Sequence, residues 1–258
     1  MAPNWSHPTT LSYSVVAFSS AVLSMKLKHD RIKEKALQLD AFDFSEPSKW
    51  EKFYEENVED CYEWHSSIPL ERIASYITPG SNCLMVGCGN SRLPQVVLSS
   101  YPNDAPRLVL LDTSKTCLDQ LRQMYGSKVE CVCGDATELS TLNLSSKTSR
   151  DYVGDRCSDN NITEQSSQDK FDIIVDKGLT DAILCGEGWN GPLKKLFKEA
   201  SGVLRDRGRY LLISYRLPSS TKDFLVKVGK PVGFEWEFDI PDDSNPRVSV
   251  SVAVKENA

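Results

Sequence analysis

The central part of the chain alternates between short apolar runs and longer stretches that mix apolar and polar residues. Five apolar runs have the length of buried strands, and they cover 82–86, 108–111, 129–133, 171–175 and 209–214. Runs that are apolar throughout are typical of parallel strands, which are buried on both faces. The segments between them are long enough to hold the connections that parallel strands need. The pattern therefore predicts a parallel sheet with helices on both of its faces.

Helical spacing marks the segments between the strands. Leu118, Leu121 and Tyr125 fall on one face of a helix after the second strand. The apolar residues of 193–204 are spaced in the same way ahead of the fifth strand. Pro94 suits the first turn of a helix that ends near Ser100.

Two further helices are predicted ahead of the sheet. Ser48 is suited to cap the first of them, with Glu51 three residues later at the capping-box position. The second covers 68–77 and stops before Pro79-Gly80.

The C-terminal segment has a different pattern. Residues 234–240 and 247–255 alternate or run apolar, and the polar connection between them contains Pro241 and Pro246. Two such strands predict an antiparallel hairpin. The fold class that follows is α/β and Rossmann-like: a seven-stranded, mostly parallel sheet with helices on both faces and a C-terminal antiparallel hairpin.

Two segments are unlike the rest of the chain. The first 25 residues contain no Asp, Glu, Lys or Arg, and their apolar patch at 11–23 is too short and too polar to cross a membrane. We expect residues 1–45 to be a disordered leader, with an organellar transit segment as the alternative. A domain over 46–258 follows, and its Ser-, Thr-, Asn- and Asp-rich stretch at 140–169 is expected to be a low-complexity surface insert.

A glycine pair follows the first predicted strand. Gly87 and Gly89 let backbone approach a ligand without a Cβ in the way, and Asp112 ends the second strand 23 residues after Gly89. A carboxylate at that point suits a ribose diol, so the pattern indicates a nucleotide-like cofactor. Dinucleotide loops need a third glycine where this chain has Arg92, which favours S-adenosylmethionine over NAD or FAD. A chance glycine pair in an ordinary turn is the alternative.

Composition argues against several classes of function. A net charge of −6 gives no support to a nucleic-acid or anionic-membrane surface, and it favours a basic partner such as a lysine-bearing protein, with an acidic surface that only keeps the protein in solution as the alternative. The eight cysteines include no CxxC pair and the three histidines are far apart, so we expect no metal site. Reduced thiols suit a cytoplasmic location.

Five motifs lie at the ends of the predicted elements: Trp50-Glu-Lys-Phe-Tyr54, Glu63-Trp64, Val86-Gly-Cys-Gly-Asn-Ser91, Leu111-Asp-Thr-Ser114, and Phe171-Asp-Ile-Ile-Val-Asp-Lys-Gly178 with Asp181-Ala182-Ile183. Together they resemble the methyltransferase-like 13 group. These are class I, seven-strand S-adenosylmethionine-dependent enzymes related to the lysine methyltransferases of translation elongation factor 1A. The resemblance covers roughly residues 46–255 without the insert. The order Leu179-Thr180 departs from the Thr-Leu of the group and leaves the protein substrate open.

The resemblance implies a set of S-adenosylmethionine contacts. Aromatic side chains ahead of the sheet would cover the cofactor, the glycine pair would admit its methionine part, and two carboxylates would bind its ribose and its adenine amino group. The residues so implied are Trp50, Tyr54 and Trp64, then Gly87 with Gly89, then Asp112 with Thr113, Asp135 with Ala136, and Lys177 after the fourth strand. Packing is the alternative role for the tryptophans, and a turn role is the alternative for Asp135.

Two residues are candidates for the reaction itself. Asp176, at the carboxyl end of the fourth strand, would orient an amine, and Tyr215, after the fifth, would form the pocket wall. The expected function is methyl transfer to a lysine of a protein, with elongation factor 1A as the candidate partner. A small-molecule methyltransferase and a catalytically silent S-adenosylmethionine-binding scaffold are the alternatives.

Overall fold

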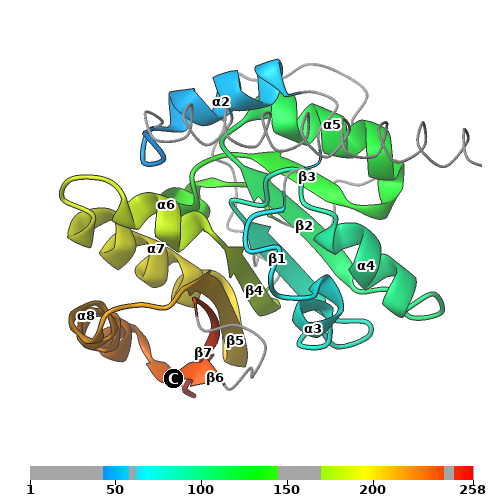
Figure 1. The fold of residues 1–258 in the computed structure, drawn as a ribbon. Helices are drawn as coiled ribbons and strands as arrows, with labels where there is room; N and C mark the ends of the chain where they lie inside the picture. The colour runs from blue at the N-terminus through cyan, green and yellow to red at the C-terminus, as the bar shows by residue number, and fades with distance from the viewer. Residues whose placement is uncertain (1–42, 58–60, 62, 145–169, 241–246, 258) are drawn as a thin grey trace, which may run out of the picture. The chain divides into compact units, whose positions relative to one another are not determined.

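In this computed structural model, seven strands of the described residues form one mixed sheet in the order β3-β2-β1-β4-β5-β7-β6 (Figure 1). The strands are β1 (Asn82–Val86), β2 (Arg107–Asp112), β3 (Glu130–Cys133), β4 (Phe171–Lys177), β5 (Leu204–Tyr215), β6 (Phe234–Ile240) and β7 (Val248–Lys255). Strands β1 to β5 pair in parallel, and β7 is antiparallel to both β5 and β6. The predicted seven-stranded sheet with its C-terminal antiparallel hairpin is confirmed.

The structure describes residues 43–57, 61, 63–144, 170–240 and 247–257. Most of the predicted leader, most of the 140–169 insert and the connection of the C-terminal hairpin lie outside these ranges. The residues from Phe44 onward form one unit by their contacts. Within the described ranges, no helix has both the length and the apolar character needed to cross a bilayer.

Helices cover the sheet on both sides. They are α2 (Pro47–Glu56), α3 (Leu70–Ala74), α4 (Leu93–Ser100), α5 (Lys115–Tyr125), α6 (Leu179–Leu184), α7 (Asn190–Val203) and α8 (Ser219–Gly229), with the 3-10 helices η1 (Gly126–Lys128), η2 (Ala136–Thr141) and η4 (Lys230–Val232). No clear pattern in the sequence marks α6 or α8, because α6 is very short and α8 buries a single large apolar side chain, Leu225.

Neighbouring strand residues alternate between two cores. On β1, Cys83 and Met85 join the core under α3, α4 and α5, whereas Leu84 and Val86 join the core under α7 and α8. Figure 1 shows these two helix groups on opposite sides of the sheet. The two cores explain why the strands carry continuous apolar runs: both faces of the sheet are covered.

The sheet reverses its direction of growth at β1. This strand pairs with β2 on one side and with β4 on the other, so the loops that follow β1 and β4 leave the sheet in opposite directions. Such a switch point opens a crevice at the carboxyl ends of the strands, which is where α/β sheets bind ligands.

The capping box predicted at the start of α2 is wrong. Glu46 is the N-cap residue and makes no side-chain cap, and the Ser48 hydroxyl donates to the Glu46 carboxylate. Glu51 instead accepts hydrogen bonds from the Ser114 hydroxyl and from the backbone N–H and hydroxyl of Thr116. Burial opposes ionisation of Glu51, but these hydrogen bonds outweigh it and lower the pKa of its carboxyl. Glu51 thereby ties α2 to the N-terminus of α5, which favours negative charge.

Candidate active site

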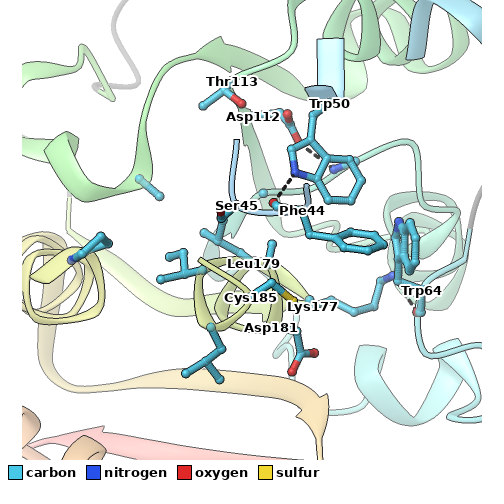
Figure 2. Close-up of a pocket in the computed structure, with 18 of the residues that line it drawn as sticks. Phe44, Ser45, Trp50, Trp64, Asp112, Thr113, Lys177, Leu179, Asp181 and Cys185 are labelled. Atoms are coloured by element: carbon cyan, nitrogen blue, oxygen red, sulfur yellow. Dashed lines mark hydrogen bonds between the residues drawn. The ribbon is translucent and has the colours of Figure 1, made fainter. Parts of the chain in front are cut away.

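A pocket of about 810 Å³ lies at the carboxyl ends of the parallel strands, a volume suited to a small-molecule ligand. Figure 2 shows part of its lining. The structure brings all of the sequence-predicted site residues to this pocket except Asp176. Its lining includes Trp50, Tyr54, Trp64, Gly87, Gly89, Asp112, Thr113, Asp135, Ala136, Lys177 and Tyr215.

Both glycines of the loop after β1 have left-handed backbone angles. Their φ values are +55° at Gly87 and +53° at Gly89, which few L side chains adopt. A Cβ at Gly89 would lie 2.7 Å from the Tyr54 hydroxyl, and a Cβ at Gly87 would lie 2.9 Å from the Cβ of Leu179. The glycines therefore let Tyr54 and Leu179 close directly onto the loop.

Substituting Gly89 with alanine is expected to weaken ligand binding. It is also expected to lower the free energy of unfolding by more than the strain of placing an alanine at a positive φ. The added Cβ must displace Tyr54, which is buried in the core. Gly188→Ala is the matched control, because Gly188 has a φ of +67° and nothing within 4 Å of an added Cβ. Thermal unfolding and ligand titration of both variants check this. Equal losses would mean that the contact with Tyr54 does not matter.

Asp112 ends β2 beside the glycine loop. Its carboxylate accepts hydrogen bonds from the backbone N–H of Gly89 at 2.9 Å and from that of Ser114 at 2.9 Å. Burial raises the pKa of the Asp112 carboxyl, and the backbone donors work against that rise. A carboxylate has about four acceptor sites, so it can accept further hydrogen bonds from a diol. Thr113, the next residue, also lines the pocket.

Asp135 has a local structural role at the opening of the pocket. Its carboxylate accepts a hydrogen bond from the Thr137 N–H at 2.7 Å and so caps η2. The side chain is exposed and lines the pocket next to the buried Ala136. The turn role considered for Asp135 is therefore present, and it leaves the carboxylate accessible from the pocket.

Aromatic rings form one wall of the pocket. Trp50 and Trp64 meet edge to face with 5.7 Å between ring centroids, and Trp50 stacks on Tyr54 at 6.3 Å. Phe44, which sequence reasoning missed, lies 5.8 Å from both Trp50 and Trp64, and its carbonyl accepts a hydrogen bond from Trp50 Nε1 (Figure 2). Phe44 precedes the first helix and has no periodic signal, so only the fold reveals its place.

The carboxylate of Glu63 lies at the N-terminal end of α4. Its carboxylate accepts hydrogen bonds from the Ser91 hydroxyl, at 2.8 Å, and from the backbone N–H of Arg92, the N-cap residue. In dinucleotide-binding folds the N-terminus of this helix binds the pyrophosphate. Here a carboxylate of the chain itself fills that position, which agrees with the preference for a phosphate-free cofactor that Arg92 suggested.

Lys177 contacts both Glu63 and the next residue, Trp64. Its ammonium lies 3.2 Å from the Glu63 carboxylate and donates to the carbonyl of Trp64 at 3.1 Å, and its side chain is only 7% exposed. Lys177 thus fastens the Glu63-Trp64 segment to the end of β4 (Figure 2). Sequence reasoning placed Lys177 in the pocket but missed Glu63 as its partner, although Glu63 directly precedes Trp64 in a quoted motif.

Asp176 does not reach the pocket, contrary to the role expected for it in orienting an amine. Side chains alternate along β4, so Asp176 points to the same core as Ile174 and Tyr210. It is fully buried and accepts hydrogen bonds from the Tyr210 hydroxyl at 2.7 Å and the Thr180 hydroxyl at 2.6 Å. Its carboxylate therefore links β4, β5 and the start of α6, and it does not line the site.

Asp176 is expected to make the fold more stable in acid. Burial raises the pKa of its carboxyl from 3.8 to about 6, although hydrogen bonds from Thr180 and Tyr210 lower it. The folded-state value lies above the unfolded one, so this contribution is complete below about pH 4 and is lost as the pH rises to about 6. The loss amounts to roughly 2–3 kcal/mol. Urea unfolding of wild type and Asp176→Asn across this range checks it, because the variant should lack this component. An identical pH dependence would contradict it.

Tyr215 lies at the rim of the pocket. Its side chain is 57% exposed, and its ring meets the ring of His65 edge to face at 4.8 Å. Asp181 and His65 line the pocket beside it. Neither was assigned a role from the sequence: Asp181 was part of a motif for which no contact was inferred, and His65 is far from the other histidines in the sequence.

The described residues contain no group of three or more side chains arranged to hold a metal ion. Seven of the cysteines lie in the described ranges, and each of these is a free thiol. Cys157 lies outside those ranges.

Comparisons with known proteins point to one group of enzymes. The chain is 25% identical over 176 residues to the eEF1A lysine and N-terminal methyltransferase of Mus musculus, which covers 67% of this chain and 22% of that protein. It is 23% identical over 184 residues to the mitochondrial citrate synthase-lysine N-methyltransferase CSKMT of Danio rerio, covering 66% of this chain and 67% of that protein. The chain thus spans about a fifth of the length of the eEF1A methyltransferases that it matches. No protein-family model matches it.

The fold has counterparts among solved structures. A TehB-like SAM-dependent methyltransferase from Corynebacterium glutamicum superposes with a TM-score of 0.52 at 18% identity, covering 82% of this chain and all of that one. The sequence relatives confirm the resemblance to the methyltransferase-like 13 group. Sheet order and structural similarity show that this chain has the class I S-adenosylmethionine-dependent methyltransferase fold, and its sequence is similar to those of the eEF1A lysine and N-terminal methyltransferases.

Proposed function

We propose that this chain is an S-adenosylmethionine-dependent methyltransferase that N-methylates lysine on a protein, with eEF1A as the candidate substrate and the cytoplasm as its location. The observation that carries the proposal is the pocket at the switch point, where the Asp112 carboxylate adjoins the glycine loop. The Glu63 carboxylate at the start of α4 supports a cofactor without phosphate. The names of the two relatives support lysine as the acceptor, although their protein substrates differ.

The cofactor side of the pocket suits S-adenosylmethionine. Asp112, with Thr113 beside it, would bind the ribose, because a carboxylate accepts hydrogen bonds from both hydroxyls of a diol. Asp135, with Ala136, would receive the adenine amino group. Gly87 and Gly89 would leave room for the methionine part, at the point where Tyr54 closes onto the loop.

The aromatic wall has two roles in this proposal. The rings of Trp50 and Trp64 would attract the positive sulfonium and keep water away from it. Glu63 and Lys177 would keep Trp64 in place, because Lys177 donates to the Trp64 carbonyl. When bound there, S-adenosylmethionine would supply a sulfonium-activated methyl group to a neutral amine, with its sulfur as the leaving group and one amine proton released overall.

The experiment that tests this proposal uses the purified full chain, tritium-labelled S-adenosylmethionine and a cell lysate. Label in a protein band that comigrates with eEF1A and is lost with Asp112→Asn would support both the activity and the candidate substrate. Label in a different band would retain lysine methylation and replace eEF1A. Binding of S-adenosylmethionine without any protein label would overturn the protein-lysine proposal in favour of a small-molecule acceptor or a silent scaffold.

A further inference from the structure

A second group of polar side chains lines the pocket away from the ribose-binding carboxylate. It consists of His65, Asp181 and Tyr215. Figure 2 shows Asp181 on the opposite side of the pocket from Asp112 and Thr113. The cofactor contacts proposed above do not use this group, so it is available for the second reactant.

The His65 side chain is buried in the wall of the pocket, and neither of its ring nitrogens makes a hydrogen bond within the described residues. Its side chain is 2% exposed, and its Nε2 lies 2.8 Å from Oδ2 of Asp181, in a close contact without hydrogen-bond alignment. Nδ1 has no hydrogen-bond partner among the described residues. The backbone φ of His65 is +61°, a strained value that directs the ring inward after the fixed Glu63-Trp64 segment.

Asp181 has no cationic partner among the described residues, although Lys177 also lines the pocket. Lys177 pairs with Glu63, whereas no Lys or Arg of the described ranges forms an ion pair with Asp181. Within the described part of the chain, the Asp181 oxygens accept only a long hydrogen bond, 3.3 Å, from the backbone N–H of Tyr215, besides their contact with His65. The negative charge of Asp181 is therefore left without a permanent cation inside a largely apolar pocket, where a cationic ligand gains most from it.

Tyr215 adds an aromatic surface to the same group. Its ring is exposed at the rim and rests edge to face against His65. A carboxylate beside an aromatic ring suits an alkylammonium, which hydrogen-bonds to the first and is attracted by the second. An acceptor that carries a carboxylate would be repelled by Asp181. A neutral hydroxyl could donate a hydrogen bond to Asp181, but it carries no positive charge for the carboxylate and the ring to attract.

We propose that Asp181 and Tyr215 bind the acceptor amine and that His65 is a positioning residue that holds the Asp181 carboxylate toward the pocket. The substrate class is then a primary or methylated alkylamine, such as the end of a lysine side chain. The inference rests on the proposed function for the identity of the reaction. It assigns the acceptor side of the site to residues that the cofactor does not need.

The test observes His65 directly by NMR. The chain has three histidines, so the His65 ring signals can be assigned with His65→Gln. The protein is saturated with S-adenosylhomocysteine and titrated with Nα-acetyl-lysine methylamide, or with its analogue in which a hydroxyl replaces the side-chain amine. The lysine probe is expected to shift the His65 signals saturably and the hydroxyl analogue is not. Asp181→Asn should abolish this response.

Asp206→Asn is the matched control, because Asp206 is exposed and lies at the opposite end of β5 from Tyr215. Tyr215→Leu, at an exposed position, gives a second variant that leaves the core intact and should weaken the lysine response. In the transfer assay, Asp181→Asn should raise the KM for the acceptor by about 10- to 100-fold with the S-adenosylmethionine affinity unchanged.

Several results would overturn the inference. Equal responses to the two probes, or a response that survives Asp181→Asn, would show that the group does not select an amine. A His65 shift caused by S-adenosylhomocysteine alone, with nothing added by the lysine probe, would assign Asp181 to the amino group of the cofactor. Calorimetry with S-adenosylhomocysteine separates the two proposals. If S-adenosylhomocysteine does not bind, the proposed function is overturned, whereas a response selective for the lysine probe still supports the amine site.

Discussion

Replacing Asp112 with asparagine is expected to weaken the binding of S-adenosylhomocysteine by about 100-fold, because hydrogen bonds to a charged group contribute roughly 1.5–3 kcal/mol. Asparagine keeps the size of the side chain but only one acceptor oxygen, so one of the two backbone donors, Gly89 or Ser114, also loses its acceptor because they donate to different oxygens of Asp112. Burial already raises the pKa of the Asp112 carboxyl, so a neutral amide is not costlier to bury there. Calorimetric titration of wild type and variant measures the loss.

The control for this prediction is Asp119→Asn. Asp119 is half-exposed on α5, pairs with Lys115 and Arg122, and does not line the pocket. Its substitution should leave the affinity for S-adenosylhomocysteine unchanged. If Asp112→Asn and Asp119→Asn bound the ligand equally well, the ribose would not be held at the end of β2.

Substituting Lys177 with methionine is expected to reduce the free energy of unfolding by about 2–4 kcal/mol and to weaken cofactor binding. The change removes the cation of a mostly buried pair and leaves the Glu63 carboxylate with the Ser91 hydroxyl and the Arg92 N–H alone. The Trp64 carbonyl also loses its donor, so the aromatic wall is no longer fastened to β4. Urea unfolding and ligand titration measure the two effects.

Two further variants make this prediction specific. Lys115→Met removes an exposed ion pair with Asp119 and should cost less than about 0.5 kcal/mol. The double variant Glu63→Gln with Lys177→Met should cost less than the sum of the single variants, because residues in one pair are coupled. Additive losses would mean that Glu63 and Lys177 act separately and that the description of this segment is wrong.

The sheet was predictable because its strands are buried on both faces. Mostly apolar runs marked β1, β2 and β4 closely, because their central positions contact two cores and polar residues such as Asp172 lie near the strand ends. The start of β5 was missed because Arg205-Asp-Arg207 is polar and exposed. The helix expected at 68–77 is limited to α3, Leu70–Ala74, so apolar spacing alone overestimated its length.

Site residues were predictable from the sequence only where they lie at the ends of neighbouring parallel strands. Gly87 and Asp112 follow the ends of adjacent parallel strands, so the fold alone brings them together. The direction of a side chain at a strand end was harder to infer: Asp176 and Lys177 are neighbours, but alternation sends Asp176 into a core and Lys177 to the pocket. Glu63 and His65 depend on contacts between segments far apart in sequence, which no local pattern reports.

The most direct test of the central claim is a calorimetric titration of the wild-type chain with S-adenosylmethionine and, in parallel, with NAD. The pocket at the end of β2, with the Glu63 carboxylate at the start of α4, predicts binding of S-adenosylmethionine with roughly micromolar affinity and no binding of NAD. Binding of NAD, or no binding of S-adenosylmethionine, would contradict the account of this site.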